Sequence, residues 1–106
     1  MMKEIKLHTK SRDNLYEATA TYKDGMVTVH SGSRINTTPG EKYQPSDEIK
    51  EIRSDKNVVA PDGKLLKDLD FNSLSTAASF VQGRIANGMI SWKTEDGKYV
   101  RETLKK

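Results

Sequence analysis

Three Asp-Gly pairs set the strongest constraint on how this chain folds. They are Asp24-Gly25, Asp62-Gly63 and Asp96-Gly97, and each lies between residues that are typical of strands. Asp-Gly readily adopts the positive backbone φ that a tight hairpin turn requires. The pairs therefore predict three β-hairpins, through recurrent turn chemistry rather than through a sequence repeat.

The hairpin around Asp24-Gly25 has the clearest pattern. Polar residues alternate with an apolar set formed by Tyr16, Ala18, Ala20, Tyr22, Val27 and Val29. A period of two indicates half-buried strands. We expect the second hairpin to join residues 58–59 to 65–66, with Leu69 and Phe71 extending its return strand. The third should join Ile90 and Trp92 to Tyr99.

Two helices are expected between the hairpins. Ser46 can cap the first, which carries two acidic residues in its first turn and ends near Asp55. The second should begin after Ser73, and its apolar residues recur at helical spacing: Leu74, Ala77, Ala78, Val81 and Ile85. Gly83 predicts a tight contact or an early helix end. Asn87-Gly88 can stop the helix in a left-handed conformation.

The expected order of elements is β-β-α-β-β-α-β-β. This order predicts an α+β domain in which an antiparallel β-sheet, built from hairpins, is covered by two helices. A chain of 106 residues suits one domain. We expect residues 1–14 to form an N-terminal extension or arm, residues 15–104 a single α+β domain, and residues 105–106 a tail.

Charge and composition narrow the class of function. The formal net charge is +3, and the excess lies in residues 83–106, since residues 1–82 carry 12 Lys+Arg and 12 Asp+Glu. This asymmetry is typical of a polyanion-binding segment or of a solvated basic tail. The chain has no cysteine, no signal-peptide core and no run of about 20 apolar residues. We expect a cytoplasmic protein with no membrane partner.

Catalytic and metal-binding motifs are missing from the sequence. His8 and His30 stand alone, and neither His-Glu-x-x-His nor Gly-x-Ser-x-Gly occurs. A metal site needs several ligands together, and a catalytic acid needs burial or a close partner. We therefore expect no enzymatic activity, no metal and no cofactor.

The stretch from Phe71 to Lys93, FNSLSTAASFVQGRIANGMISWK, concentrates the unusual residues of the chain. It combines a helix start, a small-residue helix face, a Gly-Arg step, an Asn-Gly turn and the only tryptophan. Such density is typical of a tightly specified packing unit or of a recognition surface, and the sequence leaves both open.

Extended by TEDGK, this stretch resembles the signature of a bacterial domain of unknown function, family number 4357. In that family a Ser-Pro-Ser-Ala-Ala-like helix start precedes a Gly-Arg-Ser-Ala-Asn-Gly-Trp turn and a Trp-Lys strand. Residues 22–34, YKDGMVTVHSGSR, are similar to the family's first hairpin, so the resemblance covers residues 15–104. The chain departs from the signature at Leu74, Ile85 and Met89, where the family often has proline, serine and tryptophan.

The resemblance implies an accessory role in nucleic-acid metabolism. The family occurs alone or appended to nuclease and restriction-modification proteins, and it is similar to the restriction-associated methylase-associated domain, which is proposed to read modified DNA. The implied partners are DNA, plain or modified, and a nuclease or methyltransferase protein. The nucleic-acid role is implied by association with the family alone, and neither composition nor residue spacing indicates it.

The residues that we expect to contact nucleic acid are Gly32, Ser33, Arg34, Ser73, Ser75, Arg84, Asn87, Gly88, Trp92, Lys93 and Lys98. The cationic side chains would bind phosphate, the serines open a helix whose free N–H groups suit an anion, and the tryptophan would stack on a base. The glycines and Asn87 would shape the adjoining backbone. Each also has a structural explanation: a solvated charge, a helix cap, a turn or a core aromatic ring.

The sequence thus predicts a non-catalytic accessory domain that binds DNA in restriction-modification or DNA metabolism. The alternative is a protein-interaction module that docks on a nuclease or methyltransferase or self-associates, for example through a sheet edge. A sensor of a small metabolite is a third hypothesis. We expect a monomer or a weak homodimer.

Overall fold

The hairpin around Asp24-Gly25 forms the middle of the sheet. In the computed structural model, which describes residues 4–104, strands β2 (Glu17–Lys23) and β3 (Met26–Val29) pair antiparallel across this turn. Asp24 and Gly25 have φ values of 54° and 80°, which is the left-handed conformation that the turn needs. The first predicted hairpin is confirmed.

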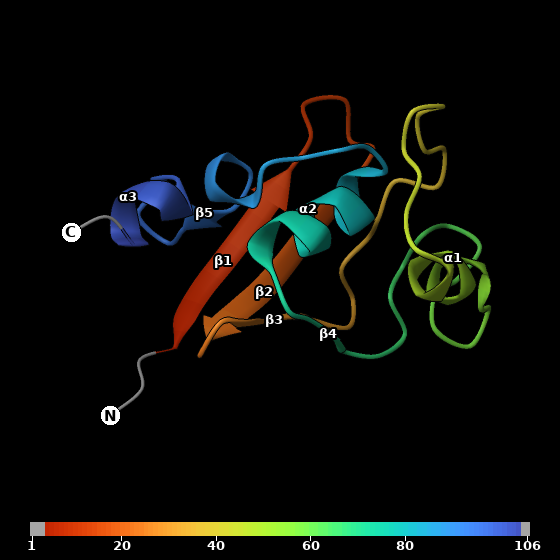
Figure 1. Ribbon diagram of the computed structural model, residues 1–106, viewed down its shortest axis with the longest axis horizontal. Coiled ribbons are helices and arrows are strands. Elements are labelled where there is room, and N and C mark those ends of the chain that lie inside the picture. The colour runs from red at the N-terminus through yellow and green to blue at the C-terminus, as the bar shows by residue number, and fades with distance from the viewer. Residues whose placement is uncertain (1–3, 105–106) are drawn as a thin grey trace.

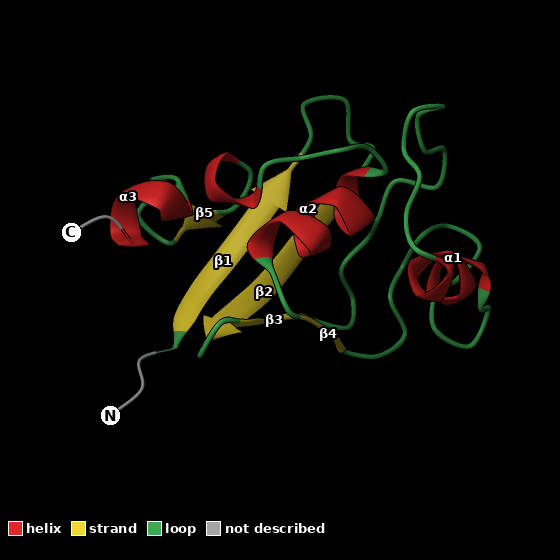
Figure 2. Ribbon diagram, viewed as in Figure 1, coloured by secondary structure: helices red, strands yellow, loops and turns green. Residues whose placement is uncertain are grey.

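Three further strands complete the sheet. Strand β1 (Ile5–Lys10) flanks β2, strand β4 (Leu69–Phe71) flanks β3, and the two-residue strand β5 (Lys93–Thr94) lies beyond β1. The order is β4-β3-β2-β1-β5, and every neighbouring pair is antiparallel. Figure 2 shows the long β1 and β2 side by side. The predicted α+β class and antiparallel sheet are confirmed.

Strand β1 differs from the expected layout. The sequence predicts an extension or arm over residues 1–14, yet residues 5–10 pair with both β2 and β5. Their side chains alternate between buried and exposed, so one face of IKLHTK joins the core. No Asp-Gly marks the turn into β2. Instead the Ser11 hydroxyl oxygen accepts hydrogen bonds from the N–H groups of Leu15 and Tyr16, at 2.6 and 3.2 Å.

The two predicted helix starts are confirmed. Helix α1 (Asp47–Ser54) begins after Ser46, whose hydroxyl oxygen accepts from the third residue of the helix, and α2 (Leu74–Gln82) begins in the same way after Ser73. A helical turn, α3 (Val100–Leu104), closes the described chain, and the predicted tail lies outside it. Figure 1 shows α2 in front of the sheet and α1 off to one side. Within residues 4–104 no helix has the length and apolar character to cross a membrane.

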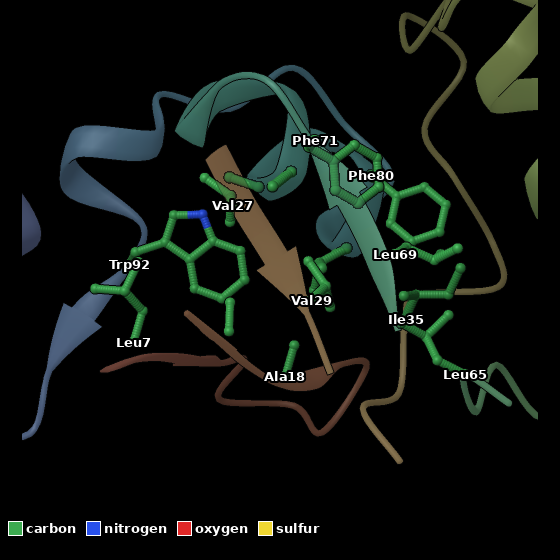
Figure 3. Packing of buried hydrophobic residues seen from close by; sticks show 14 of the residues in the cluster. Leu7, Ala18, Val27, Val29, Ile35, Leu65, Leu69, Phe71, Phe80 and Trp92 are labelled. Carbon is green, nitrogen blue, oxygen red and sulfur yellow. The ribbon is translucent and has the colours of Figure 1, made fainter. Parts of the chain in front are cut away.

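The core lies between α2 and the facing side of the sheet. As expected, Ala77 and Ala78 are fully buried, so α2 approaches the strands closely. The sheet contributes side chains from every second position, including Leu7, Ala18, Ala20, Val27, Val29, Leu69 and Phe71. Figure 3 shows Trp92 beside Leu7 on one side of this core and the rings of Phe71 and Phe80 together on the other, with centroids 5.0 Å apart.

The second and third Asp-Gly pairs make turns without the predicted hairpin strands. Gly63 and Gly97 have φ values of 91° and 83°. Around Gly63 the chain forms two isolated bridges outside the five strands, one between Val59 and Leu65 across the turn and one between Lys64 and Arg34. Strand β4 does not extend that loop, because it pairs with β3 instead. After Gly97 a single bridge joins Tyr99 to β5.

Helix α2 ends early, at the position that Gly83 predicts. The helix stops at Gln82, with Gly83 left-handed at φ 71°, so it does not reach Ile85. Asn87-Gly88 therefore does not end α2 but begins a 3-10 helix, η1 (Gly88–Ile90). The Asn87 side-chain oxygen caps η1 by accepting from the following turn. The predicted strand through Ile90 and Trp92 is wrong for this reason.

Candidate functional site

Trp92 is part of the core and cannot stack on a base. The side chain is fully buried, and its indole N–H donates to the Leu74 carbonyl oxygen at 3.1 Å. A buried tryptophan usually finds such a partner for its one donor. The hydrogen bond fixes the chain after η1 against the start of α2, so the base-stacking prediction for this residue is wrong.

Gly88, Ser75 and Ser73 also serve packing. A Cβ on Gly88 would lie 2.2 Å from the Leu74 carbonyl carbon, so only glycine fits where η1 meets α2. The Ser75 hydroxyl oxygen accepts from the Gly88 N–H at 3.0 Å, and Ser73 caps its own helix. The hydroxyls predicted to bind an anion therefore already have protein partners. Leu74, Ser75, Gly88 and Trp92 are called the Trp92 unit below.

Gly32, Ser33 and Arg34 lie apart from the other predicted residues. Ser33 is buried, and its hydroxyl bonds to the backbone of Thr19. The Arg34 guanidinium donates to the backbone and side-chain oxygens of Asn14, at 2.8 and 3.1 Å. These residues line a separate hollow that also contains the carboxylates of Glu17 and Asp62. The structure does not bring Arg34 and Arg84 into one site.

Arg84, Asn87 and Lys93 line one open groove of about 980 Å³. Its walls come from the end of β1 and the turn after it, the loop after α2, η1, and β5 with its turn. The cationic side chains in it are Lys10, Arg12, Arg84 and Lys93, and the acidic one is Asp13. Side chains from separate segments thus give the groove a positive charge. It is called the basic groove below.

The corner that carries Arg84 is held by hydrogen bonds at the end of α2. Residues 36–53 bond to four consecutive carbonyl oxygens there: Arg53 to Phe80, the Asn36 backbone to Val81, the Asn36 side chain to Gln82, and Gly40 to Gly83. Unsatisfied carbonyls at a helix end need such partners. The Nε of Arg84 in turn donates to the side-chain oxygen of Gln82 at 2.9 Å. The corner therefore has one defined shape.

Lys93 and His8 face each other across β5 and β1. Both line the basic groove, and the Lys93 ammonium lies 5.3 Å from the ring centroid of Tyr99. A cation at this distance from an aromatic ring is attracted to its face. The pair places a positive charge and an exposed phenol ring side by side at the rim.

Lys98, another predicted contact, does not line the basic groove. It is exposed in the Asp96-Gly97 turn, where its N–H and carbonyl oxygen bond to Asp96 and Thr94. The hydrogen bond from the Thr94 hydroxyl, more than that from the Lys98 N–H, lowers the pKa of Asp96. These contacts stabilise the turn that returns the chain to Tyr99.

Lys10 and Arg12 are the groove residues that the sequence reasoning missed. They fall in the segment expected to be an arm, residues 1–14, whose four cations and two acidic residues are hidden in the balanced charge count over residues 1–82. The available signal is the alternation in IKLHTK, which places Lys6, His8 and Lys10 on one strand face. Only the pairing of β1 with β5 brings Lys10 and Arg12 into the same groove as Lys93.

A second cavity of about 600 Å³ lies beside α1. Its central groups are Tyr43 and Arg53, whose guanidinium lies 5.6 Å from the Tyr43 ring centroid. Burial raises the pKa of Tyr43, partly offset by the nearby charge, and burial lowers the pKa of Arg53. Because Arg53 donates to the carbonyls of Phe80 and Asn36, it serves to fasten α1 to the end of α2.

The two histidines lie on strands or at their ends. The ring nitrogens of His30 lie 3.3 and 2.7 Å from the hydroxyls of Thr19 and Thr21, and His8 lies in the basic groove. Within residues 4–104 no three His, Asp or Glu side chains are grouped so that they could hold a metal ion. The groove thus combines cations, amides and exposed apolar groups, which is chemistry suited to binding an anion.

Comparison with known proteins gives a family match. The model of a family described as a domain of unknown function, DUF4357, matches residues 7–104. No curated protein and no solved structure matches the chain.

Proposed function

The chain belongs to the DUF4357 family. We propose that it is a non-catalytic domain that binds nucleic acid in the basic groove. The observation that carries the proposal is the convergence there of four cationic side chains with a single carboxylate. The setting in restriction-modification or DNA metabolism, with DNA as the target, follows from the family resemblance rather than from the groove.

Charge is the first support. Lys10 and Arg12 lie at one end of the groove's strand wall, Lys93 lies on β5, and Arg84 comes from the loop after α2. Phosphate groups along a backbone are neutralised by such spaced cations, and counterion release supplies much of the binding free energy. A groove of one sign also raises the local concentration of a polyanion and speeds its association.

Hydrogen-bonding capacity is the second support. Arg84 uses its Nε for Gln82, and its terminal amines have no protein acceptor within residues 4–104. A guanidinium held at one edge presents its other donors in a fixed fork, which matches two phosphate oxygens. The neighbouring Asn87 and Gly83 fix the backbone on either side, so the fork is positioned before the ligand arrives.

The test is a titration of the full chain with fluorescein-labelled plain and base-modified duplexes and single strands at about 50 and 200 mM salt. Four phosphate contacts predict that affinity falls about 100-fold between these concentrations. Removal of two cations in Arg84→Ala/Lys93→Ala should reduce the slope of log affinity against log salt by about 2. No binding by folded protein at low salt would overturn the proposal.

Lys42→Ala/Lys67→Ala is the matched control. Both lysines are exposed, and neither lines the basic groove. This variant loses the same net charge as Arg84→Ala/Lys93→Ala. If both double variants weaken binding equally, net charge rather than the groove attracts nucleic acid, and the groove assignment is wrong.

A protein-interaction module is the second candidate function. The observation in its favour is the exposure of Ile85 and Ile90 at the rim of the groove, since protein interfaces bury such side chains. Sedimentation over a range of concentrations tests self-association. A dimer that dissociates in Ile85→Ser, together with no nucleic-acid binding, would favour this candidate.

A further inference from the structure

We propose that the basic groove takes an unpaired strand, so that bases contact its apolar side chains while phosphates contact its cations. This inference rests on the proposed function and adds the class of nucleic acid. It starts from side chains that binding to a phosphate backbone alone does not require.

Exposed apolar side chains gather in the groove. Within residues 4–104 six large hydrophobic side chains are exposed, and four of them line it: Leu15 at 43%, Ile85 at 78%, Ile90 at 47% and Tyr99 at 43%. They come from four separate segments of a chain that is only 34% hydrophobic. Their convergence beside the cations indicates a ligand that is anionic along one side and apolar along the other.

A single strand has this character and a duplex does not. In a duplex the base faces are stacked inside, and the outer surface offers phosphates, sugars and the polar edges of bases. An unpaired strand exposes its base faces, which stack on aromatic rings and contact apolar side chains, while a positive groove follows its phosphates. The isoleucines and tyrosine would gain contacts only from the second kind of ligand.

Tyr99 supplies the stacking ring that Trp92 cannot supply. The backbone of Tyr99 is bridged to Lys93 on β5, and the Lys93 ammonium lies 5.3 Å from its ring centroid. The residue as a whole remains 43% exposed. A base stacked on the free part of this ring would bring its own phosphate close to the ammonium. The two side chains thus form one unit for a nucleotide.

The volume of the groove supports the same ligand. At about 980 Å³ it reaches the upper end of the ~300–1,000 Å³ range of sites that enclose small ligands. A surface that only follows a duplex backbone needs no such hollow. An open hollow with both polar and apolar walls can receive bases that have left the stack.

The experiment compares four labelled ligands with the full chain at low salt: dT12, its duplex with dA12, the RNA strand U12, and an abasic strand of equal length. We expect dT12 or U12 to bind at least about tenfold more tightly than the duplex and the abasic strand. The difference between dT12 and U12 assigns the strand to DNA or RNA.

Tyr99→Ala separates the bases from the phosphates. It should weaken binding of the preferred strand about tenfold and leave the abasic strand unchanged, whereas Tyr99→Phe keeps the ring and should restore binding. Arg84→Ala/Lys93→Ala should weaken all four ligands. The emission of Trp92 confirms that each variant is folded, because that side chain is fully buried in the core.

The outcomes distinguish this inference from the proposed function. Equal affinity for dT12, U12 and the abasic strand, or tighter binding of the duplex, would overturn the inference while nucleic-acid binding stands. Unchanged affinity of Tyr99→Ala for the preferred strand would also overturn it. Failure of all four ligands and of the base-modified duplexes to bind would overturn the proposed function itself.

Discussion

The Trp92 unit and part of the basic groove come from the same stretch of chain, residues 71–93, yet they differ in burial and in hydrogen bonding. In the Trp92 unit the ring is fully buried, its donor is satisfied, and Gly88 touches backbone. In the groove Arg84 and Ile85, which precede Gly88 by only a few residues, are exposed. The unusual residues mark the first region and ordinary surface residues make up the second.

This difference shows that close packing restricts residue types more strongly than phosphate binding does, and is therefore easier to recognise in the sequence. Close packing of η1 on α2 permits one residue type at Gly88, so the motif is conspicuous. A groove that binds phosphates permits lysine or arginine at several places, and in this chain such residues come from three segments. Density of special residues therefore indicates packing here, and the predictions below separate the two regions by their effects on stability and binding.

The largest loss of stability is expected from Gly88→Ala. The new Cβ would lie 2.2 Å from the Leu74 carbonyl carbon and 2.4 Å from its oxygen. Because these atoms are backbone, η1 or α2 must move, and we expect the free energy of unfolding to fall by about 3 kcal/mol. Urea unfolding followed by Trp92 fluorescence measures it.

Gly25→Ala is the control for this effect. Gly25 has a positive φ of 80°, but nothing lies within 4 Å of an added Cβ. We expect a loss of about 1 kcal/mol from backbone strain alone. A loss at Gly88 no greater than that at Gly25 would mean that the contact between η1 and α2 is loose.

Trp92→Phe should have the next largest effect. It keeps an aromatic ring but removes the hydrogen bond to Leu74 and part of the buried volume. We expect a loss of about 2 kcal/mol in the free energy of unfolding, measured by circular dichroism because the fluorophore is gone. A change below about 0.5 kcal/mol would show that the side chain does not hold η1 in place.

Ile85→Ser should leave stability almost unchanged. The side chain is exposed beyond the end of α2, so the free energy of unfolding should stay within about 0.5 kcal/mol, while affinity for dT12 falls. Val81→Ser, four residues earlier and fully buried, should cost at least about 2 kcal/mol. Similar losses in both variants would contradict the division between packing unit and groove.

Asp96→Asn should have the smallest effect, visible only through pH. The Thr94 hydrogen bond holds the pKa of the Asp96 carboxyl below its ordinary value of 3.8, so the folded state favours the carboxylate. The resulting stability is present above pH 3.8 and is lost as the pH falls below it. At about pH 6 the Tm of the unaltered protein should therefore exceed that of Asp96→Asn, and this difference in Tm should be smaller at about pH 3. An advantage independent of pH would exclude the carboxylate as its source.

Local signals in the sequence were sufficient for part of the fold. Asp24-Gly25 marks a real hairpin, Ser46 and Ser73 cap real helices, and Ala77-Ala78 faces the sheet. Each of these features depends on neighbouring residues, whose chemistry is visible in a short window. The α+β class follows from their order along the chain.

Pairing between distant segments was not visible in the same way. Strand β1 acquires its place from β2 and from β5, which lies more than 80 residues later. Where a strand was predicted, η1 packs on the start of α2 through Gly88 and Trp92, whose partners Ser75 and Leu74 lie 13 and 18 residues earlier in the chain. The groove was only half predicted for the same reason: Arg84 and Lys93 were identified, whereas Lys10 and Arg12 join them only through the sheet.

The position of β5 has a consequence for synthesis of the protein. The strand that pairs with the outer edge of β1, and the tryptophan that fills one side of the core, are both synthesised more than 80 residues after β1. Until then a nascent chain displays β1 as an unprotected sheet edge, which is prone to pairing with other chains. A chain released before β5 is made would therefore expose the outer edge of β1 and be prone to aggregate, whereas addition of Lys93 and Thr94 pairs that edge.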